Sequence, residues 1–167
     1  MTKRVRTPAI RALEQAGLRF ETSQYRYIER GGTAHAAAEL GLDEHAVVKT
    51  LVFDAGESGP VLVLMHGDRQ VSTHALARVL GVRRAAPCPP AIAEKITGYR
   101  VGGTSPFGSR TRLPVLVERG VLDLDRIWLN AGRRGLLVAV DPRDVVRALD
   151  ATPVECAVAP GLRFGDG

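Results

Sequence analysis

The sequence predicts an α+β fold built around a curled, largely antiparallel sheet. Segments of strand character and segments of helical character alternate along the 167 residues. Several consecutive strand segments are joined by links too short for the crossover that parallel strands require, which argues against a doubly wound parallel sheet. The chain length and an apolar fraction of 45% fit a single domain, 1–167, with a substantial core.

Capping residues and apolar spacing predict five helices. Thr7 is placed to cap a helix that starts at Pro8. Ile10 and Leu13 lie near helical spacing, and Gly17 supplies a left-handed end. Comparable signals predict further helices at 33–41, 72–81, 89–96 and 141–149.

Short apolar or alternating runs between these helices predict the strands. Glycine and charged turns separate them, and β-branched residues dominate several of them. Beyond Ala151 the chain contains Pro153, Pro160 and three glycines, so we expect a core of about 7–150 followed by a loose C-terminal tail. The predicted strands are 19–27, 46–53, 60–66, 114–117, 126–130 and 136–140.

Lys49 is the one charged residue inside the strand predicted at 46–53. Alternation along a strand places Lys49 on the same face as the apolar side chains of Val47 and Leu51. Its ammonium group therefore either extends outward to solvent or meets a partner in a cleft. The strand alone leaves both interpretations open, and the second makes Lys49 a candidate positive charge in a binding site.

A glycine-rich loop, TGYRVGGTSPFG, is predicted at 97–108. Gly102 and Gly103 remove the Cβ atom where the backbone turns sharply or approaches a ligand, and Pro106 fixes one φ angle. Such a loop is either an ordinary turn between strands or a set of N–H groups directed at an anion or a developing oxyanion.

Five segments occur in a fixed order along the chain. RTPA at 6–9 and the lysine strand VKTL at 48–51 precede the glycine-rich loop, and RLP at 112–114 and NAGRRGL at 130–136 follow it. In this order, from about Thr7 to Leu149, the chain resembles the YbaK/EbsC family. These proteins are free-standing relatives of the editing domain inserted in bacterial prolyl-tRNA synthetases.

The resemblance implies a fold, an activity and partners. The fold is a mixed pseudo-barrel flanked by helices. The activity is trans-editing hydrolysis of mischarged aminoacyl-tRNA, with cysteine on proline-specific tRNA as the expected substrate. In the cysteine-clearing branch, the resemblance implies that the substrate's own thiol attacks its ester and leaves as a thiolactone. The implied partners are the tRNA acceptor end and prolyl-tRNA synthetase.

The resemblance also implies roles for individual residues. Lys49, Gly102 and Gly103 are expected to be catalytic. Lys49 supplies a fixed positive charge, and backbone N–H groups from Gly102 to Ser105 stabilise an oxyanion, so no Ser/His/Asp triad is required. The residues expected to contact the substrate are Tyr25, Thr104, Ser105, Pro106 and Leu137.

Two positions depart from the family pattern. Tyr27 stands where the family commonly has a histidine, and Leu137 stands where the cysteine-clearing branch often has an aspartate. Both changes leave the amino-acid selectivity open, so a deacylase for alanine, serine or threonine esters is an alternative. A noncatalytic tRNA- or nucleotide-binding module is an alternative of another class. Retention of Lys49 together with Gly102 and Gly103 favours an enzyme.

The charge balance favours a phosphate-rich partner. The formal net charge is +5 and the sequence pI is about 9.8. Arginine doublets near one face would follow the end of a tRNA. The candidate tRNA-binding residues are Arg110, Arg112, Arg133 and Arg134.

Other chemistry finds little support in the sequence. There is no GxSxG, GxxxxGK[ST] or HExxH motif. The four histidines form no compact ligand pattern, and Cys88 and Cys156 form no CxxC, so we expect neither a metal nor a cofactor. The basic start at 1–6 lacks the apolar core of a signal peptide, and no window is long enough for a membrane span. A cytoplasmic location is the expectation, and the oligomeric state stays open.

Overall fold

The computed structural model describes residues 5–159, so the basic start at 1–4 and the end at 160–167 lie outside the described residues. Within this range, eight strands form one sheet in the order β1-β7-β6-β2-β3-β5-β8, and β4 pairs with β2 outside this series. The strands are β1 (Glu21–Gln24), β2 (Val47–Asp54), β3 (Pro60–His66), β4 (Ala86–Pro87), β5 (Val115–Glu118), β6 (Ile127–Asn130), β7 (Leu136–Val140) and β8 (Thr152–Val154).

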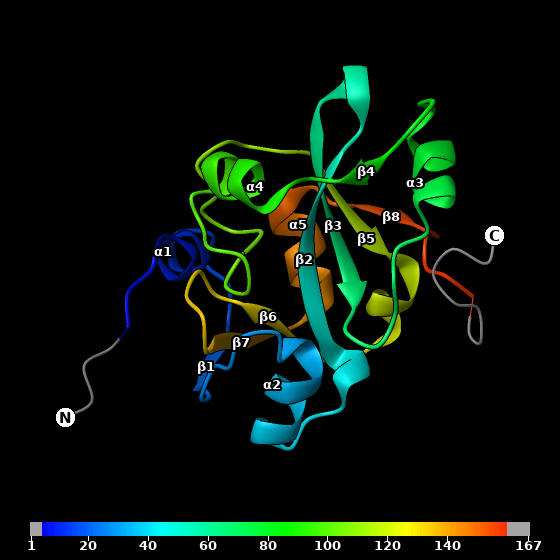
Figure 1. Ribbon diagram of the computed structural model, residues 1–167. Coiled ribbons are helices and arrows are strands. Elements are labelled where there is room, and N and C mark those ends of the chain that lie inside the picture. The colour runs from blue at the N-terminus through cyan, green and yellow to red at the C-terminus, as the bar shows by residue number, and fades with distance from the viewer. Residues whose placement is uncertain (1–4, 160–167) are drawn as a thin grey trace.

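The sheet is mixed and curled. The pairs β1–β7, β6–β7, β2–β3 and β2–β4 are antiparallel, whereas β2–β6, β3–β5 and β5–β8 are parallel. In Figure 1, β6 and β7 run nearly across the direction of the long β2–β3 hairpin, so the sheet bends along its length. The predicted α+β class with a curled, largely antiparallel sheet is confirmed.

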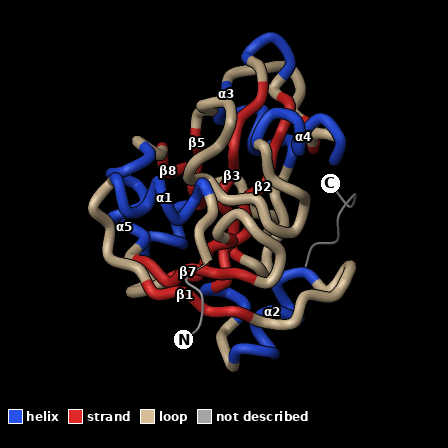
Figure 2. The backbone as a smooth tube through the Cα atoms, turned by 90° about the vertical axis from the view of Figure 1, so that its left-hand side faces the viewer, coloured by secondary structure: helices blue, strands red, loops and turns tan. Residues whose placement is uncertain are grey.

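Five helices within residues 5–159 flank this sheet. In Figure 1, α3 lies on one side of the β2–β3 hairpin and α1 and α4 lie on the other. Helix α2 lies at the end of the sheet where β2 begins, and Figure 2 shows α5 on the side of the molecule away from α2. The helices are α1 (Pro8–Gln15), α2 (Gly32–Leu40), α3 (Thr73–Leu80), α4 (Pro90–Thr97) and α5 (Pro142–Leu149).

The helix ends use the capping residues that the sequence predicted. Thr7 Oγ1 accepts a hydrogen bond from the N–H of Ile10 at 3.1 Å, which satisfies one of the free donors in the first turn of α1. Gly41 and Gly81 end α2 and α3 in the left-handed conformation, with φ of 65° and 66°. Local sequence therefore determines where these helices begin and end.

Alternating side chains of β2 enter different apolar clusters. Val48 belongs to the largest cluster, whereas Phe53 packs in a second cluster that includes residues of α3. Val47 packs in a third cluster with Leu137 and two alanines of α2. On its face of β2, Lys49 therefore has an apolar neighbour before it and another after it along the strand. This places its ammonium group beside the core.

The expectation of a loose tail after Ala151 is wrong for residues 152–159. Strand β8 pairs in parallel with β5, and the buried carboxylate of Glu118 accepts hydrogen bonds from the N–H groups of Cys156 at 2.7 Å and Ala157 at 3.2 Å. Pro153 is tolerated because β8 is an edge strand, where a missing N–H donor breaks no ladder. The end of the chain beyond 159 lies outside the described residues.

Candidate active site

Lys49 lies on the central strand β2, opposite Met65 of β3. Its side chain is half-buried and lines a cavity of about 410 Å³. This position differs from that of a lysine on an outer strand, because β2 pairs with β3 along its length and with β6 through Val47 and Val48, directly before Lys49. The cavity is lined by Lys49, Leu51, Phe53, Gln70, Val71, Thr73 and Pro87.

Two carboxylates favour the charged form of Lys49. Burial lowers the pKa of Lys49 from its ordinary value, and the negative charges of Glu44 and Asp68 act in the opposite direction. Glu44 is held in place because its Oε1 accepts a hydrogen bond from Thr33 Oγ1 at 3.0 Å. The same hydroxyl oxygen lies 3.1 Å from the carbonyl oxygen of Gly67, next to Asp68, so its one proton is shared between the two acceptors. The site therefore pairs a partly desolvated ammonium group with fixed acidic neighbours.

The glycine-rich loop after α4 is closed on itself by hydrogen bonds. Tyr99 donates its hydroxyl proton to the carbonyl oxygen of Phe107 at 2.6 Å. The N–H of Gly103 donates to the carbonyl oxygen of Arg100 at 2.9 Å, so Gly103 is not one of the free oxyanion donors that the sequence suggested. Among the described residues, no hydrogen bond engages the N–H groups of Gly102, Thr104 or Ser105.

The loop packs directly against the turn between β6 and β7. The N–H of Gly132 donates to the carbonyl oxygen of Gly103 at 3.0 Å. A Cβ atom on Gly103 would lie 2.8 Å from the backbone nitrogen of Arg134, so only glycine permits this approach. Together the loop and the turn form a second cavity of about 310 Å³, lined by Gly98, Tyr99, Arg100, Gly103, Gly132, Arg133 and Arg134.

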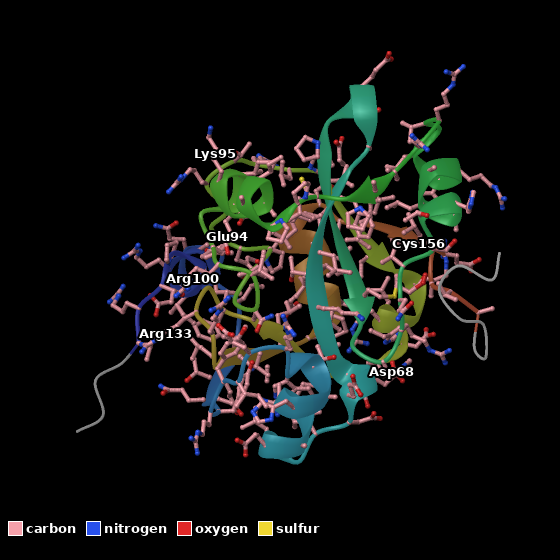
Figure 3. The ribbon with its side chains drawn as sticks, viewed as in Figure 1. Asp68, Glu94, Lys95, Arg100, Arg133 and Cys156 are labelled. Carbon is pink, nitrogen blue, oxygen red and sulfur yellow. The ribbon has the colours of Figure 1, made fainter. Side chains whose placement is uncertain are left out.

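The four arginines predicted to bind tRNA differ in their surroundings. The Nε of Arg134 donates to the carbonyl oxygen of Val101 at 2.9 Å, and its guanidinium carbon lies 4.9 Å from the centroid of the Tyr27 ring. Arg133, Arg110 and Arg112 are exposed, and Arg133 extends from the same side of the molecule as Arg100 (Figure 3). These two contacts hold the Arg134 side chain against the glycine-rich loop. The guanidinium groups of the other three arginines remain exposed to solvent, where a phosphate can reach them.

Tyr25 and Leu137 lie together in the third apolar cluster. The N–H of Tyr25 donates to the carbonyl oxygen of Gly135 at 2.9 Å, and its ring packs against the cluster that contains Leu137 and Val47. Leu137 is only 2% exposed and lines neither of the two cavities. The prediction that Leu137 contacts the substrate is not supported by its position, because the alanines of α2 pack against it and it lines neither cavity.

The predicted catalytic residues divide between two places. Lys49 lines the larger cavity and Gly103 lines the smaller one, and the two cavities share no lining residue. Val47 precedes Lys49 on the same face of β2 and packs in the cluster of Leu137, on the strand that follows the turn, but it lines neither cavity. Gly102 lies at the Tyr27 ring, where an added Cβ atom would be 2.9 Å from the hydroxyl oxygen.

A histidine pair beside this site was missed from the sequence. The rings of His45 and His66 stack with centroids 3.7 Å apart, and His45 Nδ1 lies 2.8 Å from Asp68 Oδ1. The expectation that the histidines form no compact group is wrong here, because pairing of β2 with β3 places Val48 opposite His66 and so brings the two rings together. Nitrogen and carboxylate atoms of this group lie within 4.8 Å of one another. Within the protein, the Nδ1 atom of His45 is already engaged by Asp68, and the Nδ1 atom of His66 lies 2.8 Å from the carbonyl oxygen of His45.

The sequence pattern of the family described as "Aminoacyl-tRNA editing domain" matches residues 31–148. The chain belongs to this family. The matched range includes β2 with Lys49, the glycine-rich loop and the turn before Leu136. The resemblance inferred from the lysine strand, the loop and the turn is thereby confirmed.

Individual relatives agree with the family. The chain is 27% identical over 142 residues to EbsC of Enterococcus faecalis, a candidate Cys-tRNA(Pro)/Cys-tRNA(Cys) deacylase by its name, with 84% of this chain and 87% of EbsC covered. It is 30% identical over 95 residues to the proline–tRNA ligase of Thermodesulfovibrio yellowstonii, which covers 57% of this chain but only 16% of the ligase. This editing domain therefore corresponds to a small part of the ligase.

A solved structure has the same fold. The crystal structure of a protein described as a candidate trans-editing enzyme for prolyl-tRNA synthetase superposes with a TM-score of 0.83. The match covers 93% of this chain and 100% of the other at 24% identity. In the part of the chain that is described, no helix combines the length and hydropathy needed to cross a membrane.

Proposed function

We propose that this editing domain is an aminoacyl-tRNA deacylase that acts in trans, with cysteine attached to proline-specific tRNA as its substrate. The observation that carries the proposal is the half-buried ammonium group of Lys49, which lines a cavity of about 410 Å³ beside two carboxylates. The name of the relative EbsC supports the choice of cysteine. The tRNA acceptor end is the partner that the activity requires, and prolyl-tRNA synthetase is the enzyme whose errors it would correct.

The reaction needs orientation and charge more than a protein nucleophile. An aminoacyl ester is already activated, so the domain has to seat the end of the tRNA and stabilise the oxyanion that forms at the ester carbonyl. Lys49 is the group we assign to the oxyanion or to the adjacent ribose oxygen. Between Gly102 and Ser105, the N–H groups of Gly102, Thr104 and Ser105 are the backbone donors that remain.

For a cysteinyl ester, the nucleophile is the substrate's own thiol. The sulfur attacks the ester carbonyl carbon, a carbon–sulfur bond forms, and the bond between that carbon and the ribose oxygen breaks. The thiol proton ends on the ribose oxygen, which gives a tRNA with a free hydroxyl and cysteine thiolactone. A serine ester is expected to react much more slowly, because a hydroxyl is the weaker nucleophile at neutral pH.

A deacylase for alanine esters is the second candidate. It is favoured by the sequence, because apolar Leu137 stands where the cysteine-clearing branch often has an aspartate. Leu137 lies buried beside Tyr25 and lines neither cavity, so this departure bears on the branch of the family and not on a pocket wall. Water would be the nucleophile for alanine, and free amino acid would be the first product.

A panel of tRNA(Pro) charged with cysteine, alanine, serine or threonine tests the proposal. We expect the fastest ester loss from the cysteinyl substrate, with thiolactone trapped before it hydrolyses. Rapid release of alanine without thiolactone would replace cysteine by alanine and leave the deacylase assignment intact. Binding of every charged tRNA with no ester loss would instead identify a noncatalytic tRNA-binding module.

A further inference from the structure

The smaller cavity, between the glycine-rich loop and the turn that joins β6 to β7, is separate from the place where Lys49 would meet the ester. Its volume is about 310 Å³, and it shares no lining residue with the larger cavity. Its lining consists of arginines, glycines and Tyr99. Arg110 borders it as well, since a Cβ atom on Gly98 would lie 3.6 Å from the Nε of Arg110. Such a wall favours an anionic ligand over an apolar one.

Two of the lining arginines carry charges that no ion pair neutralises within residues 5–159. Arg100 and Arg133 are exposed, and both extend from the same side of the molecule (Figure 3). Neither forms a salt bridge with a described carboxylate. Glu94 lies on this side too, but its Oε1 accepts a hydrogen bond from the N–H of Val101 at 3.0 Å. The two guanidinium groups therefore keep their donors for a ligand.

The turn between β6 and β7 adds backbone donors to the same wall. Gly132 has φ of 90°, and its N–H is bonded to the carbonyl oxygen of Gly103. The N–H groups of the next two residues, Arg133 and Arg134, make no hydrogen bond with any described residue. Successive N–H groups in a turn can form a concave site for an anion. Side-chain and backbone donors thus meet at one cavity.

We propose that this cavity binds one phosphate group of the RNA strand whose ester is cleaved at Lys49. The planar guanidinium groups of Arg100 and Arg133 donate paired hydrogen bonds to the phosphate oxygens, and the N–H groups of the turn complete the site. The inference rests on the proposed function, because it takes aminoacyl-tRNA as the ligand. A free phosphate ion presents the same oxygens, so the tests below separate the two sources.

Binding of the single-stranded RNA tetranucleotide ACCA, labelled at its 5′ end, is the first test. In three versions of this RNA, one internucleotide phosphate at a time is replaced by an uncharged methylphosphonate. We expect one version to bind wild type about tenfold more weakly than the unmodified RNA does. The same version should bind the double variant Arg100→Gln, Arg133→Gln no more weakly than unmodified RNA does, because the partner charges are already gone. Both residues are exposed, so the variant should fold normally.

The salt dependence of RNA binding counts the phosphates that are contacted. Each phosphate contact on a single strand contributes about 0.7 to the slope of log K against log salt. Because both arginines bind one phosphate, the double variant should lose about 0.7 and not about 1.4. Arg78→Gln on α3 is the matched control, since Arg78 is exposed and lines neither cavity. A loss of about 1.4, or an equal loss in Arg78→Gln, would indicate a diffuse basic surface and overturn the shared site.

Inorganic phosphate at constant ionic strength separates the two sources. It should shift the amide NMR resonances of Arg133 and Arg134 in wild type and compete with the RNA. Shifts without an effect of any methylphosphonate replacement would identify a site for free phosphate and overturn the assignment to RNA. The absence of both effects would overturn the site itself.

The two proposals fail in different ways. A chain that binds ACCA through this cavity but cleaves no ester would refute the deacylase and leave the phosphate site standing. A chain that cleaves the ester with the same KM and salt slope in the double variant as in wild type would refute the phosphate site and leave the deacylase standing.

Discussion

Arg134 donates a hydrogen bond from Nε to the carbonyl oxygen of Val101 at 2.9 Å, and this contact ties the turn after β6 to the glycine-rich loop. The guanidinium group also lies over the ring of Tyr27. Arg134 was expected from the sequence to contact tRNA phosphates. Its contacts in the fold also support a positioning role for the loop, and the tRNA contact stays a prediction.

Arg134→Lys should lower kcat of deacylation by about 10- to 100-fold, because small displacements of groups around a reacting centre carry costs of this size. Lysine keeps the charge but has no planar fork to hold both Val101 and Tyr27. Arg133→Lys is the control, since Arg133 is exposed and the substitution should affect at most KM, because lysine keeps the positive charge. Equal effects of the two substitutions on KM alone would show that Arg134 is an ordinary phosphate contact.

Gly102→Ala tests whether the loop is part of the site or merely a turn. Gly102 has φ of 94°, and an added Cβ atom would lie 2.9 Å from the Tyr27 hydroxyl oxygen. Gly81→Ala is a control with φ of 66° and no atom within 4 Å. Both should lose about 1–2 kcal/mol of stability from the left-handed backbone. Only Gly102→Ala should slow deacylation. Full activity in the folded fraction of Gly102→Ala would show that the loop is an ordinary turn and not part of the site.

Glu44→Gln should move the alkaline loss of activity to lower pH. Activity that needs the ammonium form of Lys49 is lost as pH rises through the pKa of that residue. Burial lowers this pKa, and Glu44 is the first of the two charges that raise it again. Removal of the carboxylate therefore lowers the pKa of Lys49 further. The measurement is the pH profile of kcat/KM on one substrate.

The comparison of enzymes on the same substrate cancels the titration of the substrate's own thiol and amine. Glu57→Gln changes an exposed carboxylate in the 3₁₀ turn Gly56–Ser58 at the tip of the β2–β3 hairpin and should leave the profile in place. Superimposable profiles for wild type and Glu44→Gln would mean that Lys49 does not act through its charge.

His66 should make the fold sensitive to acid. The side chain is 4% exposed, and burial is the largest cause that lowers the pKa of His66 below its usual value. Below about pH 6.5 the unfolded chain therefore binds more protons than the folded chain. The contribution of neutral His66 to stability is present above that pH and is lost as the pH falls through the folded-state pKa of His66.

Urea titrations at several pH values between 7 and 5 measure this effect. The free energy of unfolding should fall more steeply for wild type than for His66→Asn, by at most about 1.4 kcal/mol per pH unit for one proton. Asparagine retains a donor for the carbonyl oxygen of His45, which lies 2.8 Å from His66 Nδ1. Parallel stability curves would assign the acid sensitivity to other groups.

Local signals in the sequence predicted most of the fold. Thr7, Gly41 and Gly81 act within one turn of the backbone, so their capping roles are independent of distant contacts. The strands β4 and β8 were missed because they are two and three residues long and contain proline. Their existence depends on β2 and β5, whose exposed edges they extend.

The site was predictable only in part. Lys49 stands out in the sequence as a charge within an apolar strand, and the structure places it in a cavity. The partners of Lys49 were not predictable, because Asp68 reaches it only after the β2–β3 hairpin has closed and Glu44 is held by Thr33 of α2. The burial of Leu137 under α2 likewise depends on how a helix 100 residues earlier packs against β7.

The rate of ester loss from Cys-tRNA(Pro) under single-turnover conditions, compared between wild type and Lys49→Ala, tests whether Lys49 is catalytic. Lys95→Ala on α4 is the matched control, because Lys95 is exposed. We expect Lys49→Ala to fold normally and to lose about 10²–10³-fold in rate, as for removal of one oxyanion-stabilising group. Lys95→Ala should retain the wild-type rate. A folded Lys49→Ala variant with the wild-type rate would contradict the account.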